Sequence, residues 1–335
     1  MKIIITGSLG NISKPLAQEL VQKGHSVTVI STKADKQKDI ESLGAKAAIG
    51  SIDDVNFLTK TFTGADAIYS MLPPFKYFEN PNMDARAEAK RIATNYAEAI
   101  KGAGVKRVVH LSSIGAHLEK GNGVLAFHFV AEQVLKQLPG DVAITSMRPV
   151  GFYYNLYDFM DIIKGKGFLD GFVGKIMTLR YYGLKALMQG KKGLIMSNYG
   201  AKDKMPWVSP IDIAAAIADE LTTPLNGRKV RYVASEELTC YEIASILGAA
   251  IGKPYLKWET ISDKQMLSGL KKFKVPLNLA NDITEMNASM HSGLLFEDYY
   301  KNKPVMGKIK LKDFAKEFAV VYNQKIIIAC DEVLF

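Results

Sequence analysis

Apolar and polar positions along the first half of the chain predict strands that alternate with helices. Short apolar runs rich in β-branched residues, such as 3–5 and 27–30, are typical of strands buried on both faces. The segments 15–23 and 84–102 instead carry apolar residues at helical spacing, and glycines stand near their ends. By the same criteria, further strands are expected at 45–49, 67–72, 108–112 and 143–147, and further helices at 36–43, 55–62 and 125–138.

This order of elements predicts an α/β fold with two unequal parts. Apolar strands joined by helices indicate a Rossmann-type, doubly wound parallel sheet over residues 1–150. After Pro149 the alternation is lost, and residues 151–335 are expected to form a smaller, partly irregular substrate lobe. Whether part of 206–240 returns to the sheet is left open. Regular elements within this lobe are expected at 210–221, 231–233 and 240–251.

A glycine-containing turn follows the first expected strand and opens the first expected helix. Gly7 permits a tight turn, and Gly10 lets the backbone approach a pyrophosphate, while the helix N-terminus offers free N–H groups. Ser13 stands where a third glycine is usual, and it is small enough for close packing of helix on strand. The segment is therefore predicted to bind a dinucleotide through Gly7, Ser8, Leu9, Gly10, Asn11 and Ile12.

The GSLGNIS turn has the glycine spacing of the short-chain dehydrogenase/reductase superfamily, and further segments resemble its atypical, NmrA-like branch. In order they are MLPP (71–74), AIKGAGVKRVVHLSS (99–113), AEQVLK (131–136), SMRPVGFYYN (146–155), PWVSPIDIAAAIADEL (206–221) and YEIASILGAAIGKP (241–254). The resemblance spans about residues 1–265 and implies an NAD(P)-binding protein. It also implies cofactor contacts at Met71, Leu72, Pro73, Ser112 and Pro149, and a substrate pocket edged by Phe152, Tyr153 and Asn155. These aromatic residues either stack on a flat acceptor or form the core of the lobe.

The end of the second strand bears on the choice of cofactor. An acidic residue there would bind the ribose hydroxyl of NAD, whereas a basic residue accommodates the extra phosphate of NADP. Here the run is Ser31-Thr32-Lys33, with Lys36 close behind and no acid before Asp35. Two hydroxyls and a lysine favour NADP over NAD.

The resemblance also implies a Tyr-x-x-x-Lys pair on the helix after the fifth strand, where the lysine lowers the pKa of the phenol. Counting back from Glu132 places Val124 and His128 at those two positions, and residues 114–140 contain no tyrosine. We therefore take Ser113 and His128 as candidate catalytic residues. The alternative for His128 is a histidine satisfied in the core among its phenylalanine neighbours.

The same spacing occurs twice elsewhere, at Tyr181/Lys185 and at Tyr299/Lys303. With this content of tyrosine and lysine, about two such pairs are expected by chance. Tyr181 also follows the sixth strand, which is the wrong order for the superfamily.

Three functions fit these residues. The first is an NADPH-dependent reductase of a quinone or another flat, conjugated acceptor, because such a reaction does not require the tyrosine–lysine pair. The second is a non-catalytic redox sensor that binds the dinucleotide and regulates a protein partner. The third is a nucleotide-sugar epimerase or dehydratase, against which the missing pair counts.

Composition and charge limit the partners and the cellular compartment that we expect for this protein. The net charge is +9, but the lysines are scattered, so nucleic acid is not the expected partner. Cys240 and Cys330 are too few for a disulfide framework and match no metal motif, which favours a cytoplasmic protein without a metal site. No signal peptide and no apolar run of about 20 residues is seen, so no membrane contact is expected. A monomer or homodimer that acts on a small molecule is the expectation.

Overall fold

The computed structural model describes residues 1–164, 179–180, 188, 193–224 and 227–324. Among these residues, seven strands form one parallel sheet in the order β10–β6–β5–β4–β1–β2–β3. This is the Rossmann order with one strand added at the β6 edge. The strands are β1 (Lys2–Ile5), β2 (Ser26–Ser31), β3 (Lys46–Ile49), β4 (Ala67–Met71), β5 (Arg107–Leu111), β6 (Ala143–Pro149) and β10 (Arg228–Val233). The predicted α/β, doubly wound fold is confirmed.

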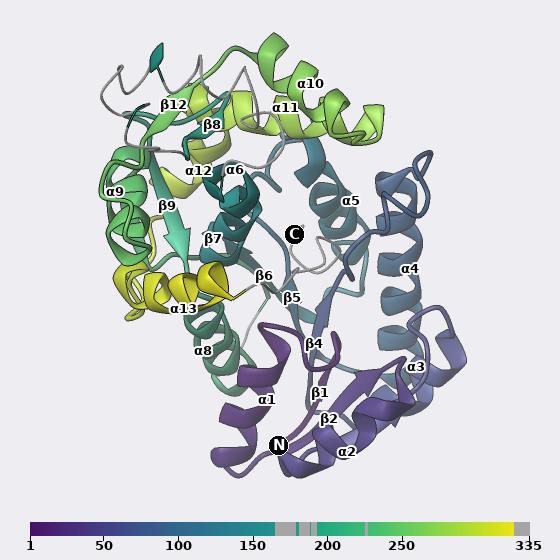
Figure 1. Cartoon of the computed structure of the whole chain (residues 1–335). Helices are drawn as coiled ribbons and strands as arrows, with labels where there is room; N and C mark the ends of the chain where they lie inside the picture. The colour runs from purple at the N-terminus through teal and green to yellow at the C-terminus, as the bar shows by residue number, and fades with distance from the viewer. Residues whose placement is uncertain (165–178, 181–187, 189–192, 225–226, 325–335) are drawn as a thin grey trace.

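Helices cover both faces of this sheet (Figure 1). On one face α1 (Ser13–Gln22) packs against α8 (Pro210–Thr222), and on the other α3 (Val55–Phe62), α4 (Ala85–Ala103) and α5 (Ala126–Leu135) lie side by side. α2 (Gln37–Ser42) lies beside β3 at the far edge. Because helices bury both faces, the apolar residues of the central strands are shielded from solvent, and Ile3, Ile4 and Ile5 of β1 have no exposed surface.

Local sequence explains where the helices begin. Asp54 accepts a hydrogen bond from the N–H of Phe57 at the start of α3, and Asp84 accepts from two N–H groups at the start of α4. α8 begins with Ser209 as the cap and Pro210 in the first turn. α1 differs, because Ile12 stands at its N-terminus and no side chain caps it.

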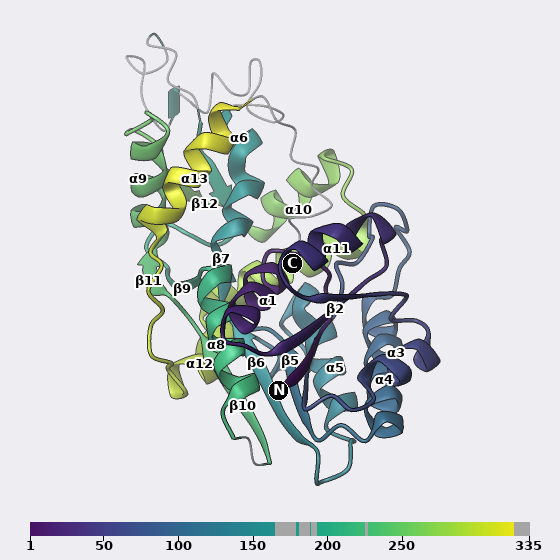
Figure 2. The ribbon, with the colours of Figure 1, turned by 90° about the horizontal axis from the view of Figure 1, so that it is seen from below.

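The remaining described residues form a second layer above the carboxyl ends of the strands. Figures 1 and 2 show α6, α9 and α13 gathered on one side of it, remote from α3 and α4. Two small sheets complete it, in the orders β11–β9–β7 and β12–β8. The helices are α6 (Met160–Lys164), α9 (Cys240–Ala250), α10 (Asp263–Lys272), α11 (Leu277–Ser292), α12 (Glu297–Lys301) and α13 (Leu311–Asn323). The strands are β7 (Gly151–Phe152), β8 (Ile195–Ser197), β9 (Lys204–Val208), β11 (Glu236–Thr239) and β12 (Trp258–Thr260), and the short 3₁₀ helices are η1 (Ala34–Lys36), η2 (Gly123–Leu125), η3 (Tyr153–Phe159) and η5 (Leu294–Phe296).

After leaving the main sheet at the end of β6, the chain returns to it with β10. β10 pairs in parallel with β6 along its whole length, from Arg228 opposite Ile144 to Val233 opposite Pro149. Residues well beyond position 150 therefore complete the sheet. No helix within the described ranges is long and apolar enough to cross a membrane.

Candidate dinucleotide and acceptor site

The glycine turn after β1 has the geometry of an anion site. Gly7 has a φ of +88°, and a Cβ atom there would lie 2.4 Å from the Sδ atom of Met71. The N–H of Gly10 donates to the carbonyl of Gly7 at 3.2 Å, which closes the turn. The first turn of α1 has no acidic residue and no side-chain cap. The N–H of Lys14 donates to the carbonyl of Gly10 at 3.0 Å and Pro15 has no N–H, so the groups left for a phosphate are the N–H groups of residues 11–13, at the positive end of the helix dipole.

Ser13 explains why a third glycine is not needed. Its hydroxyl donates to the carbonyl of Thr6 at 2.9 Å, so the side chain ties the start of α1 to the end of β1. Ser8, with a φ of +54°, donates through its hydroxyl to Ser31 at 2.9 Å. The turn is thereby linked to the end of β2.

The loop after β2 leaves two polar side chains free for a ligand. Thr32 and Lys33 are exposed and line the cavity, while Ser31 is buried and accepts a hydrogen bond from the N–H of Lys33 at 3.2 Å. Lys36 also lines the cavity, and its amine is paired with Asp39 at 3.3 Å. A hydroxyl and a free lysine at this position fit the extra phosphate of NADP.

One cavity of about 1850 Å³ joins this turn to a chamber under the second layer. That volume exceeds the roughly 300–1,000 Å³ of a pocket for one small ligand, so it can hold a dinucleotide beside a second molecule. Most of the site residues predicted from sequence line it. They are Gly7, Ser8, Leu9, Gly10, Asn11, Ile12, Ser31, Thr32, Lys33, Met71, Leu72, Pro73, Ser112, Ser113, His128, Phe152 and Asn155.

Two predicted residues do not face the cavity. Pro149 ends β6, where its carbonyl accepts from the N–H of Ile114 at 2.9 Å, and the next residue, Val150, reaches the cavity instead. Tyr153 is fully buried; its ring stacks on Phe314 and its hydroxyl donates to Glu236 at 2.6 Å. For Tyr153 the lobe-core alternative is the correct one, because η3 turns its side chain toward α13.

His128 lines the cavity on α5 with an imidazole that is held neutral. Burial lowers its pKa to about 3, the nearby His110 adds to the effect, and its Nδ1 atom is buried without a hydrogen-bond partner. The adjacent Phe127 meets Phe75 edge to face, with ring centroids 4.8 Å apart. The loop after β4 and helix α5, which carries His128, therefore touch each other at the wall of the cavity.

Of the two spaced tyrosine–lysine pairs, the structure describes one, Tyr299 and Lys303, and this pair supplies no phenol to the cavity. Tyr299 donates to Glu237 at 3.0 Å, and Lys303 forms an ion pair with the same carboxylate at 2.7 Å. Burial raises the pKa of Tyr299, and this residue is absent from the cavity lining. The pair is a structural contact. Tyr181 and Lys185 lie outside the described residues.

A family model described as NmrA-like matches residues 1–305. The chain belongs to the NmrA-like family. Among solved structures, this NmrA-like chain is similar to the NADPH-dependent quinone oxidoreductase of Escherichia coli in complex with NADPH, with 19% identity, a TM-score of 0.69, and 94% of this chain and 99% of that one covered. It is also similar to the triphenylmethane reductase of Citrobacter sp., with 18% identity, a TM-score of 0.68, and coverage of 96% and 100%. At these identities the likeness shows the fold alone.

A curated relative matches over a shorter stretch. UDP-glucose 4-epimerase of Streptomyces lividans is 28% identical over 131 residues, which cover 35% of this chain and 37% of the epimerase. The match thus spans about a third of that relative. It fits the shared nucleotide-binding fold and carries no more than that.

Sequence reasoning missed the part of the cavity that the NmrA-like chain builds from its C-terminal helices. Met286 and Met290 stand one turn apart on α11 and line the chamber, a spacing that does signal one helix face. No local signal shows where that face docks. The docking depends on a contact across the chain, where a Cβ on Gly123 would lie 2.0 Å from the carbonyl of Asp282. Further lining residues from this region are Lys264, Gln265, Met266, Phe273, Asn287, Leu295 and Phe296.

Proposed function

We propose that this protein is an NADPH-dependent reductase of a quinone or another flat, conjugated acceptor. The observation that carries the proposal is one continuous cavity, which runs from the glycine turn to a chamber walled by aromatic and methionine side chains. Phe75, Phe127, Phe152, Met286 and Met290 contribute to that wall. Flat apolar rings pack well against such side chains, and methionine adapts to acceptors of different outline.

NADPH fits the residues that this chain places at the inner end of the cavity. Gly7 and Gly10 keep the turn free of side chains, uncapped α1 offers N–H groups, and Thr32 with Lys33 suits the extra phosphate. The quinone oxidoreductase and the triphenylmethane reductase similar to this chain were solved with NADPH and NADP(H). When bound, NADPH would supply the hydride, and the protein would orient the acceptor and exclude water.

The proton requirement also favours an activated acceptor. A simple alcohol or ketone needs a positioned acid–base group, whose loss typically lowers the rate by about 10²–10⁴. A quinone oxygen accepts its proton from a weaker donor or from water. Ser113 and the neutral His128 are our candidate donors among the residues that line the cavity, and neither is a strong acid, so alcohols should be poor substrates.

The test is NADPH oxidation by the full chain with a panel of benzoquinones, naphthoquinones and a triphenylmethane dye. We expect turnover with at least one of them, no turnover with secondary alcohols, and much lower activity at low NADPH concentration in a Gly10→Leu variant, whose affinity for the dinucleotide should be reduced. A protein that binds NADPH tightly but is inert with every acceptor would overturn the reductase and favour the redox sensor. Interconversion of UDP-glucose and UDP-galactose would favour the epimerase.

A further inference from the structure

Ser112 stands where β5 reaches the cavity, and its hydroxyl proton is already committed. Its Oγ atom lies 2.6 Å from Oε1 of Glu132, and the two residues are only 2% and 1% exposed. Glu132 is held by a two-pronged contact from Arg148, with Nε 2.9 Å from Oε1 and Nη2 2.7 Å from Oε2. A guanidinium held in this way pairs with a carboxylate, which has no proton to donate. The serine must therefore be the donor.

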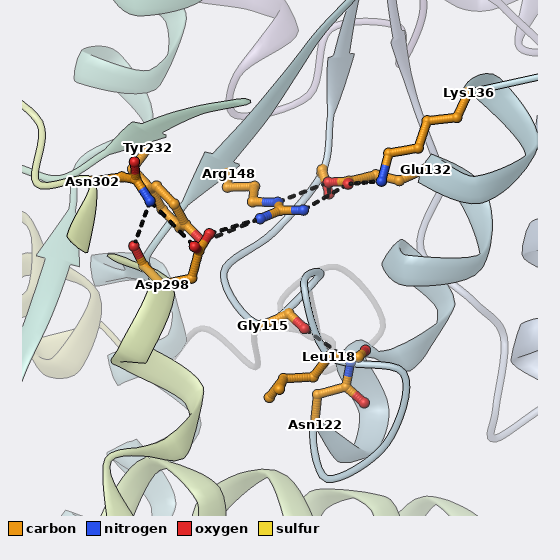
Figure 3. A network of polar contacts seen from close by, with 10 residues as sticks. Gly115, Leu118, Asn122, Glu132, Lys136, Arg148, Tyr232, Asp298 and Asn302 are labelled. Carbon is orange, nitrogen blue, oxygen red and sulfur yellow. Dashed lines mark hydrogen bonds and ion pairs between the residues drawn. The ribbon is translucent and has the colours of Figure 1, made fainter. Parts of the chain in front are cut away.

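Arg148 is itself fixed from the other side, so the arrangement has little freedom to change. Its Nη1 atom forms an ion pair with Asp298 at 3.1 Å, and Tyr232 donates to the same carboxylate at 2.6 Å. Figure 3 shows the guanidinium between Glu132 and Asp298, with Tyr232 beside Asp298. What Ser112 offers to a ligand is a pair of acceptor lone pairs and no proton.

We propose that Ser112 acts only as a hydrogen-bond acceptor toward the cavity, and that it accepts from the carboxamide N–H of the nicotinamide ring. This rests on the proposed binding of NADPH. Ser112 follows β5, two strands away from the glycine turn after β1. Strands lie about 4.8 Å apart, so the two places are separated by roughly 10 Å. That is too far for Ser112 to bind the pyrophosphate and suits the ring at the end of the dinucleotide, whose carboxamide is an N–H donor.

Glu132 and Arg148 are positioning residues in this scheme, since they act through Ser112. The same arrangement excludes Ser112 as the proton donor to a reduced acceptor. The chain also contains a matched control. Thr145 donates to Glu220 at 3.0 Å, and Arg231 holds that buried glutamate at 2.8 Å, but Thr145 is absent from the cavity lining.

The experiment compares the binding of NADPH with that of its 3-acetylpyridine analogue, which keeps the carbonyl but has no N–H. Dissociation constants are measured by calorimetry, without any acceptor. We expect wild-type protein to bind NADPH roughly 3–10-fold more tightly than the analogue, as one hydrogen bond predicts. Ser112→Ala should lose that discrimination by weakening NADPH alone. Thr145→Val should keep it.

A second variant tests the positioning role. In Glu132→Leu with Arg148→Met and Asp298→Asn the buried ion pair is replaced by apolar side chains, and the second carboxylate that Arg148 holds is neutralised, so that no charge of the network is left unpaired. The Ser112 hydroxyl is then free to turn and donate, so discrimination should fall toward one. Loosening of the second layer would weaken both ligands alike, so the ratio of their affinities remains the readout. Unchanged discrimination in this variant would contradict the role of Glu132.

The outcomes separate this inference from the proposed function. Equal weakening of both ligands by Ser112→Ala would show that the serine does not read the carboxamide N–H, and a ribose hydroxyl would become the donor. Discrimination that survives Ser112→Ala would overturn the inference alone. Failure of the wild-type protein to bind either dinucleotide would overturn the inference together with the proposed function.

Discussion

Two histidines near the cavity, His110 and His128, have pKa values that keep their side chains uncharged at neutral pH. His110 has no exposed surface, and burial lowers its pKa to about 4, while the pKa of His128 beside it is lowered to about 3. Ser70 lies 3.0 Å from Nδ1 of His110, which orients that ring. At pH 7 both imidazoles are neutral. A proton from His128 would come from a neutral ring N–H, which is a weak donor.

The turnover of a quinone should therefore depend little on this histidine. We expect His128→Gln to lower kcat by less than about tenfold, since a positioned general acid would be worth about 10²–10⁴. The pH profile of kcat should lack an inflection near 6.5, the usual pKa of histidine. A loss of several orders of magnitude, measured by steady-state NADPH oxidation, would mark His128 as the acid.

The same two histidines predict how stability depends on pH. Their pKa values are lower in the folded than in the unfolded chain, so the unfolded chain binds more protons below 6.5. Their contribution is complete above pH 6.5 and is lost as the pH falls, toward about 4 for His110 and about 3 for His128. Urea denaturation at a series of pH values should show this decline, with a shallower slope in His128→Gln. Identical slopes would contradict it.

Among the elements, the glycine turn and α1 are the parts whose role sequence predicts most directly. Gly24 lies just after the other end of this helix, with a φ of +81°, and no atom lies within 4 Å of the position that a Cβ atom would take. It serves as the control for Gly10, because it is a glycine next to the same helix but far from the phosphate-binding turn. We expect Gly24→Ala to lower the free energy of unfolding by about 1 kcal/mol through backbone strain, with unchanged NADPH affinity.

Gly10→Leu should instead lower NADPH affinity and leave the stability of the fold largely unchanged. Gly10 has no positive φ, so a side chain there adds no backbone strain, although its Cβ would lie 3.3 Å from the carbonyl of Gly7 and the turn must shift by a few tenths of an ångström. We expect the fold to survive this small shift. The side chain would occupy space needed by the pyrophosphate, and NADPH affinity should fall by at least about tenfold. Calorimetric titration and urea denaturation of both variants check the contrast. Equal affinity in Gly10→Leu and wild type would remove the turn from the site.

The loop after β2 carries the choice between NADP and NAD. Thr32→Ala with Lys33→Glu removes two polar partners of the extra phosphate and adds a repelling charge. NADPH affinity should fall by roughly tenfold or more, while NADH affinity stays within about threefold of its wild-type value. Dissociation constants that move together would show that this loop does not read the phosphate.

Some elements of the fold and the site can be predicted from the sequence, and others cannot. The strands and helices around the turn are predictable to within a few residues, because continuous apolar strands and capped helices leave local signals; Asp84 and Ser209 are examples. The pocket position expected for Tyr153 is wrong, since an aromatic residue after β6 fits either a pocket or a core. The docking of α11 is not predictable, because Gly123 and Asp282 meet across more than a hundred and fifty residues of chain.

In the whole molecule, the second layer is anchored to the sheet through charge as well as apolar packing. Asp298 on α12 reaches Arg148 on β6, and Leu295 on η5 covers Gly115 in the loop after β5. The Asp298 side chain is 29% exposed, so solvent weakens its ion pair. The contact should hold α11 and α12 in place over the cavity.

Removal of that contact should loosen the second layer before the sheet. We expect Asp298→Ala to lower the free energy of unfolding by about 1–2 kcal/mol. Amide hydrogen exchange should quicken in residues 277–301 and stay unchanged in β1, β2 and β4. Hydrogen exchange with mass spectrometry checks both regions. Uniform acceleration would indicate one cooperative unit instead.

The order of strands also has a consequence for the chain as it is synthesised. Every residue of β6 is buried, and the strand that covers its outer edge, β10, is translated about eighty residues later. A nascent chain halted between them would present the unpaired edge of β6 to its neighbours on the polysome. The risk that nascent chains aggregate through this edge thus depends on how soon residues 228–233 emerge from the ribosome.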